Sequence, residues 1–85
     1  MMLNTNMFKP SSYQLQNILL PMKSGQKLDC NEGVNYKCWL VVELCGKKIR
    51  KYVRKNSVES LCRNKVIIFD FLGNFLINPY IHWKS

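Results

Sequence analysis

The side chains best suited to chemistry are cationic and aromatic, and they gather between residues 37 and 55. The stretch KKIRKYVRK (47–55) holds six cationic side chains among nine residues and no acid. Aromatic rings stack on unpaired bases, and Lys and Arg neutralise phosphates, so the pattern is typical of proteins that bind single-stranded RNA or DNA. The predicted nucleic-acid-binding residues are Lys37, Trp39, Lys47, Lys48, Arg50, Tyr52, Arg54 and Lys55.

Two other interpretations of the same stretch stay open. A strand with one buried face needs polar side chains on its other face, and lysines on an edge strand prevent pairing with other sheets. In that case Trp39, Val41 and Tyr52 would form a second core layer beneath a helix. Duplex nucleic acid is also a candidate ligand, because a two-stranded ribbon fits the major groove.

The aromatic end of the chain suggests an alternative function. The segment NFLINPYIHW (74–83) is too apolar to be buried completely in a chain of 85 residues. An exposed remainder would form a protein interface, since Tyr, Trp and Phe are enriched at such surfaces. The chain would then be an interaction or regulatory module, of the kind that a virus or mobile element encodes, with an acidic protein or a second copy as its partner. The predicted interface residues are Phe75, Ile77, Tyr80, Ile81 and Trp83.

The other reactive side chains do not form a catalytic or metal-binding pattern. The chain has one histidine, His82, and a small basic ribonuclease would need it beside Arg50 or Arg54. Asp70 is better suited to accept hydrogen bonds from the backbone of a turn. The cysteine spacing C-x7-C-x6-C-x16-C lacks the close pairs that zinc sites use. We therefore expect a protein that is not an enzyme and that uses no metal or cofactor.

The composition indicates one folded, basic domain. The net charge of +8 attracts polyanions, and an apolar content of 47% suffices for a packed core. No secretory signal is recognisable, and no stretch reaches the ~18 apolar residues that cross a bilayer. We therefore expect a cytoplasmic protein without a membrane partner. The even number of cysteines permits two disulfides, but reduced thiols are expected in that compartment.

A helix and a leader are predicted at the beginning of the chain. Ser11–Ser12 offers a helix start, and apolar residues follow at helical spacing. The helix should end at Pro21, because the residue before a proline avoids helical geometry. Residues 1–10 are expected to be a flexible leader, and residues 23–33 have the composition of turns.

The clearest strand is VNYKCWLVVEL (34–44), in which every second residue is apolar or aromatic and should face the core. A hairpin then leads into the cationic stretch. The preferred connection is the four-residue loop CGKK, which sets Trp39 opposite Arg54. A two-residue Cys45–Gly46 turn would instead set Trp39 opposite Tyr52. Lys51 falls on the inner face in both registers, so its amine must reach the edge of the sheet.

The rest of the chain predicts a short helix and a second hairpin. Asn56 stands at the start of a capping-box spacing, with Ser57 as an alternative cap, and the segment predicts one or two helical turns. Strands are expected over 66–72 and 75–81, joined by a tight turn at Gly73–Asn74. The predicted fold is a single small α+β domain over residues 11–85. Its twisted antiparallel sheet comprises two β-hairpins, with closure into a small barrel as an alternative, and it carries an N-terminal helix and a short connecting helix.

Overall fold

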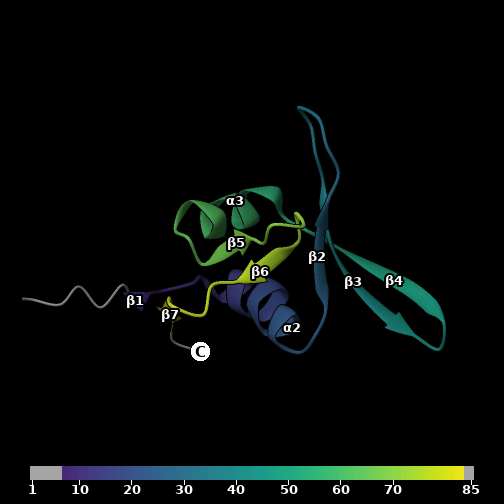
Figure 1. The fold of residues 1–85 in the computed structure, drawn as a ribbon, viewed down its shortest axis with the longest axis horizontal. Helices are drawn as coiled ribbons and strands as arrows, with labels where there is room; N and C mark the ends of the chain where they lie inside the picture. Colours follow the sequence, from purple (N-terminus) through teal and green to yellow (C-terminus); the bar gives the residue numbers. More distant parts are fainter. Residues whose placement is uncertain (1–6, 84–85) are drawn as a thin grey trace, which may run out of the picture.

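The chain forms a small α+β domain, as predicted. The computed structural model describes residues 7–83. The elements in chain order are β1 (Met7–Phe8), α1 (Ser12–Gln14), η1 (Leu15–Leu19), α2 (Leu20–Lys23), β2 (Lys27–Cys30), β3 (Cys38–Leu44), β4 (Lys47–Val53), α3 (Lys55–Arg63), β5 (Ile67–Phe69), β6 (Phe75–Ile77) and β7 (His82–Trp83) (Figure 1). They make an antiparallel β2-β3-β4 sheet, an antiparallel β5-β6 hairpin and a short parallel β1-β7 pair. The described strands thus form three separate sheets, and the barrel is not confirmed.

The first helix, formed by α1, η1 and α2 together, begins where the sequence predicts. Ser11 is its N-cap, and the Ser11 side-chain oxygen accepts the backbone N–H of Gln14 at 3.1 Å. The Gln14 side chain in turn accepts the backbone N–H of Ser11 at 2.9 Å, which completes a capping box. The Gln14 amide nitrogen also donates to the backbone oxygen of Ser57 at 3.2 Å, so the same side chain ties this helix to α3.

The helix does not end at Pro21, and that prediction is wrong. It continues to Lys23 because the turn before the proline is a π-helix, in which the N–H of Leu20 donates to the oxygen of Leu15. A proline ring clashes with the carbonyl four residues earlier in an ordinary α-helix. The wider π turn relieves this clash, so the helix passes through the proline with a local change of pitch.

The β3–β4 hairpin turns at Cys45–Gly46, so the preferred four-residue loop is wrong and the two-residue alternative is correct. Both turn residues have positive φ, 51° at Cys45 and 78° at Gly46. Positive φ at both positions is what a type I′ turn requires, and that turn matches the twist of the flanking strands. Trp39 therefore pairs with Tyr52 and not with Arg54.

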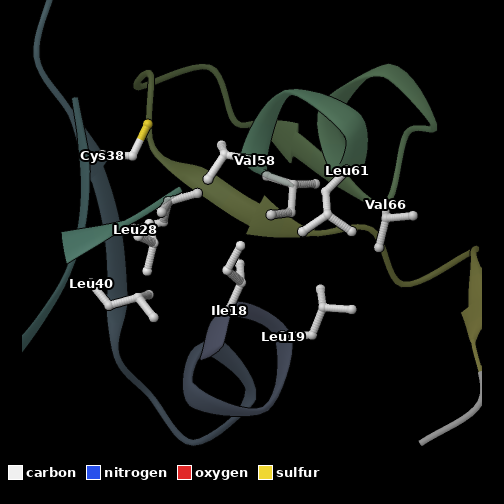
Figure 2. Close-up of a cluster of buried hydrophobic side chains, with 10 residues drawn as sticks. Ile18, Leu19, Leu28, Cys38, Leu40, Val58, Leu61 and Val66 are labelled. Atoms are coloured by element: carbon white, nitrogen blue, oxygen red, sulfur yellow. The ribbon is translucent and has the colours of Figure 1, made fainter. Parts of the chain in front are cut away.

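The buried core lies between the first helix, α3 and the inner face of the β2-β3-β4 sheet (Figure 2). Its members are Ile18, Leu19, Leu28, Cys38, Leu40, Val53, Val58, Leu61, Val66 and Ile67. On β3 only Cys38 and Leu40 are buried, whereas Val34 and Leu44, predicted on the same apolar face, are 90% and 53% exposed. The strand begins at Cys38, and Val34 lies in the preceding loop.

The hairpin therefore extends beyond the core, and Figure 1 shows β3 and β4 leaving the rest of the domain together. We call residues 41–50 the arm. Lys51 lies at its base on the inner face, as predicted, and its amine donates to the side-chain oxygen of Asn17 at 3.2 Å. The arm is consequently anchored at its base and free at its tip, where Cys45 is exposed.

The second hairpin has a longer connection than predicted. Phe69 pairs with Phe75, so residues 70–74 form the loop in place of a two-residue turn. Asp70 organises this loop as expected, since its Oδ1 accepts the backbone N–H of Asn74 at 2.8 Å. That backbone hydrogen bond stabilises the ionised carboxylate and lowers the pKa of Asp70 below its ordinary value.

Two residues assigned to the flexible leader belong to the folded domain. Met7–Phe8 form β1 and pair with His82–Trp83, and the side chains of Phe8 and Trp83 pack against the core. Of the rest of the predicted leader, residues 9–10 have no regular secondary structure, and residues 1–6 lie outside the described residues. Within the described part, no helix is both long enough and apolar enough to span a bilayer.

Candidate nucleic-acid interface

The outer face of the β3–β4 hairpin brings two aromatic rings and a guanidinium together. Trp39 and Tyr52 lie directly opposite each other across the two strands. The Arg50 guanidinium carbon is 5.7 Å from the centre of the Trp39 ring, within the range of a cation–π contact. Tyr52 is 56% exposed, and Trp39 is half-buried. Three predicted site residues therefore share one patch at the base of the arm.

The positive charge of the arm lies along β4. Every residue from Lys47 to Tyr52 is exposed, and the sheet order places β4 at an open edge. Lys48 shares the outer face with Arg50, opposite Glu43, while Lys47 lies on the inner face next to the turn. Asp29 of β2 pairs with Trp39, so the acids of this face belong to β2 and β3. A polyanion would therefore meet the cations by approaching from the β4 side.

Two predicted binding residues, Arg54 and Lys55, are engaged elsewhere. Arg54 is the N-cap of α3, and its backbone N–H donates to the Tyr13 hydroxyl at 3.0 Å. Its guanidinium carbon lies 4.3 Å from the centre of the Tyr13 ring. The Lys55 amine lies 4.6 Å from the centre of the Tyr36 ring. Because α3 begins at Lys55, the Asn56 cap predicted from the sequence is also wrong.

A disulfide joins Cys30 and Cys38, whereas reduced thiols were predicted. Strand β2, which the sequence analysis assigned to turns, sets the two cysteines directly opposite each other with their Cα atoms 4.1 Å apart. The local signal for β2 was that Leu28 and Cys30 alternate with polar residues. Those polar residues, Asp29 and Asn31, are also typical of turns and obscured the signal. Cys45 and Cys62 are free.

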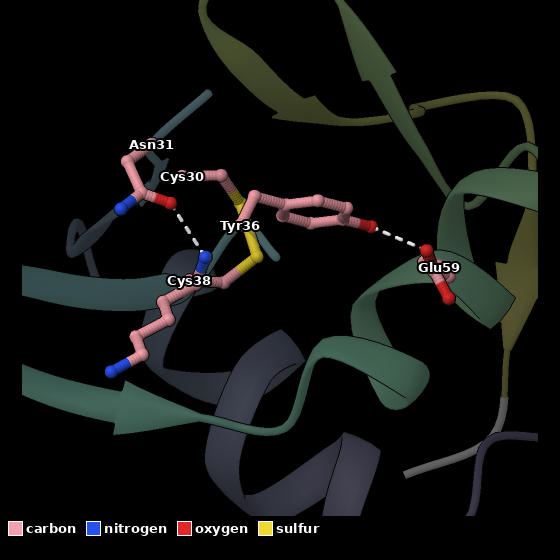
Figure 3. The surroundings of a disulfide bond; sticks show 6 residues. Cys30, Asn31, Tyr36, Cys38 and Glu59 are labelled. Atoms are coloured by element: carbon pink, nitrogen blue, oxygen red, sulfur yellow. Dashed lines mark hydrogen bonds between the residues drawn. A yellow bond between two sulfur atoms is a disulfide. The ribbon is translucent and has the colours of Figure 1, made fainter. Parts of the chain in front are cut away.

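The loop closed by the disulfide is also held by hydrogen bonds (Figure 3). The Asn31 side-chain oxygen accepts the backbone N–H of Lys37 at 2.6 Å. The Tyr36 hydroxyl donates to Glu59 Oε2 at 2.6 Å, which fixes the loop to α3. The exposed Lys37 is thus positioned two residues before Trp39 at the end of a braced loop.

The contact with Glu59 makes the stability of the domain depend on pH through Tyr36. Partial burial, the hydrogen bond and the negative charge of Glu59 together raise the pKa of Tyr36 from 10.0 to about 12. The unfolded chain therefore loses this proton near pH 10, while the folded chain keeps it until about pH 12. The stabilising contribution is complete below pH 10 and is lost as pH rises through 12.

Replacing Tyr36 by Phe should remove this dependence. Below pH 10 the Tyr36→Phe variant should be less stable than the original chain by about 1 kcal/mol, the usual worth of a hydrogen bond. The difference should shrink between pH 10 and 12, because the ionised phenol can no longer donate to Glu59. Urea unfolding of both proteins at several pH values measures it. A stability difference that stayed constant to pH 12 would contradict the assigned contact.

The predicted protein-interface residues are mostly packed inward. Phe75, Ile81 and Trp83 contact the core, Ile77 is half-buried, and only Tyr80 is largely exposed, at 84%. The exposed apolar side chains lie instead on β5, the following loop and β6. They are Phe69, Phe71, Leu72 and Leu76, of which Phe71 is 96% exposed. Hydrophobicity alone does not distinguish the packed set from the exposed set, so exposure could not be predicted from the sequence.

Comparison with known proteins identifies no relative: no family model, curated protein or solved structure matches this chain. Among residues 7–83, no group of three or more His, Cys, Asp or Glu side chains is placed to hold a metal ion. Function must therefore be argued from the surfaces described above.

Proposed function

We propose that this protein binds single-stranded RNA or DNA through the outer face and β4 edge of its β3–β4 hairpin. The observation that carries the proposal is the Trp39–Tyr52 pair with Arg50 beside it, on a face where Tyr52 is open to solvent. A buried position for both rings would have left only a charged surface. The exposed Tyr52 and the accessible part of Trp39 add stacking platforms to that surface.

The division of labour follows from the chemistry of each group. Unpaired bases stack on Tyr52 and on the accessible part of Trp39, and every base has a π-face that suits this contact. Lys48 and Arg50 neutralise phosphates along the β4 edge, with Lys47 at the tip. The proposal assigns no chemical step to the protein.

Single strands are favoured over a duplex because only unpaired bases present their faces for stacking. A duplex would use the cations alone, with the arm lying in the major groove. Binding of labelled single-stranded RNA, single-stranded DNA, duplex DNA and heparin, each titrated at several salt concentrations, tests the proposal. Single strands should bind most tightly, and equal affinity for heparin would reduce the interface to a charged patch.

Removing the indole should weaken binding without changing its electrostatics. Trp39→Ala is expected to cost roughly 1–3 kcal/mol, or about 5- to 150-fold in affinity for a single strand. The dependence of affinity on salt should stay the same, since no phosphate contact is lost. Fluorescence anisotropy with a labelled oligonucleotide measures both quantities.

Two control variants separate stacking from folding. Trp39→Phe keeps a ring and should retain most of the affinity. Tyr52→Ala removes the more exposed ring and should lower affinity with little effect on stability. If Trp39→Ala and Tyr52→Ala both remain folded and bind as tightly as the original chain, the rings are not stacking platforms.

A protein-interaction module is the second candidate function. It is favoured by one specific observation, the exposure of Phe69, Phe71 and Leu72 on the second hairpin. Contiguous exposed apolar side chains mark interaction surfaces. This candidate assigns the interface to the β5–β6 loop and leaves the arm without a nucleic-acid role.

A further inference from the structure

An open groove lies between the β2–β3 loop, α3 and the β5–β6 hairpin, with a volume of about 780 Å³. Three aromatic side chains line it: Tyr36 from the loop, and Phe69 and Phe75 from the hairpin. The rings of Phe69 and Phe75 are paired, with their centres 4.5 Å apart. The groove therefore has an aromatic wall built from two separate parts of the chain, one of them braced by the disulfide.

The groove is acidic although the chain as a whole is strongly basic. Asp29, Glu32 and Glu59 line it, with Arg63 as the one cation among its lining residues. The side chains of Glu32 and Glu59 supply this negative charge, since Asp29 pairs with Trp39 on the outer face of the sheet, and the chain as a whole has a net charge of +8. Glu59 Oε2 accepts the hydrogen bond of the Tyr36 hydroxyl, and the carboxylate has further lone pairs that can contact a cation.

Apolar side chains at the edge of the groove remain exposed to solvent. Val34, next to the lining residue Gly33, is 90% exposed. Phe71 and Leu72, which precede the lining residue Gly73, are 96% and 72% exposed. The groove thus offers an apolar and acidic surface, and its natural occupant carries apolar side chains flanked by cations.

We propose that this groove binds the arm of a second copy of the chain. On the inner face of the arm, the exposed Leu44 and Ile49 lie beside Lys47, and Lys48 lies next to the same turn on the opposite face. The arm therefore presents the apolar and cationic side chains that the groove lacks. It also projects from the domain, so it can reach into a neighbouring molecule. The inference uses the same arm as the proposed function but does not depend on its affinity for nucleic acid.

The geometry of this contact is head-to-tail, because the arm and the groove are different surfaces of one chain. Such heterologous contacts form rings or open chains instead of two-fold dimers. Nucleic acid and a neighbouring groove would compete for Lys47 at the tip of the arm. Single-stranded nucleic acid should therefore dissociate the assembled protein.

Analytical ultracentrifugation of the nuclease-treated full chain, over a range of concentrations, tests the inference. The groove variant Glu32→Lys and the arm variant Lys47→Glu/Lys48→Glu should each weaken self-association by more than about tenfold, since like charges then meet. An equimolar mixture of the two variants should associate again, because the intact arm of one meets the intact groove of the other. Recovery in the mixture also shows that both variants are folded.

The control variant Lys9→Glu/Lys65→Glu changes the net charge by the same amount as the arm variant, but its substitutions are at exposed positions outside the arm and the groove. It should associate like the original chain. A chain that stays monomeric at the highest soluble concentration would overturn the inference. A groove variant that associates as tightly as the original chain would also overturn it. The same holds if the chain stays monomeric while its groove binds a foreign Lys-rich peptide. The groove variant keeps the arm intact, so normal oligonucleotide binding by it would leave the proposed function standing even if self-association fails.

Discussion

Replacing Lys47, Lys48 and Arg50 together by Ala should weaken binding to single-stranded nucleic acid about 100-fold at 0.1 M salt. Each phosphate contact on a single strand contributes about 0.7 to the slope of log affinity against log salt concentration. Losing three contacts should therefore make the slope shallower by about two. Each unit of slope corresponds to about a tenfold change in affinity between 1 M and 0.1 M salt. Titrations at four or more salt concentrations measure both the affinity and the slope.

A control variant with the same loss of net charge distinguishes a site from a general attraction. Lys9, Arg63 and Lys65 are exposed and lie outside the β3–β4 hairpin, so their replacement by Ala should change the slope little. Arg54 is left intact in both variants because it packs on Tyr13. Equal losses from the two triple variants would show that binding follows net charge and has no site on the arm.

The largest expected effect on stability comes from Leu40, at the base of the arm. Leu40 is 1% exposed, and Leu40→Ala should destabilise the domain by about 2–5 kcal/mol through lost burial and the cavity left behind. Single domains are stable by about 5–15 kcal/mol in total, so the variant should lose a large fraction of its stability. Urea denaturation monitored by circular dichroism measures the change.

Leu44 is the matched control, since it lies on the same face of the same strand but is 53% exposed. Leu44→Ala should change stability by less than about 0.5 kcal/mol, as exposed positions generally do. Similar losses from both substitutions would mean that the arm packs against the domain along its whole length. In that case the arm would not be free to bind a ligand.

The parts of the fold that depend on neighbouring residues were predictable from the sequence. The Ser11 cap, the β3–β4 hairpin and the role of Asp70 all follow from side chains a few residues apart. The position of Lys51 was also predictable, because both candidate registers place it on the inner face. Local hydrogen bonds and alternation determine these features, and no distant contact competes with them.

The features that the sequence did not reveal depend on contacts between distant segments or on a small energetic balance. Strand β2 is stabilised by pairing with β3, and its polar residues resemble those of a turn when considered alone. The helix continues past Pro21 because a single π turn relieves the steric clash. The two hairpin registers had pairing preferences of similar strength, and the register that forms requires a positive φ at Cys45, which its residue type does not predict.

Part of the candidate site could be predicted from the alternation of residues along the strands. Alternation places Trp39, Arg50 and Tyr52 on the same face in either register, so their grouping did not require the correct loop. Arg54 has the same parity, but the strand ends at Val53 and the chain turns into α3. Sequence periodicity predicts a face only as far as the strand extends, and the end of β4 could not be located from the sequence.

The central claim is that the exposed rings and cations of the β3–β4 hairpin contact single-stranded nucleic acid. A ¹⁵N NMR titration of the full chain with a short single-stranded oligonucleotide tests it most directly. The account predicts that the largest shifts involve the Trp39 indole N–H and the backbone amides of residues 39–52, with α3 and the β5–β6 hairpin little changed. Shifts that avoid this hairpin, or no shifts at low salt, would contradict it.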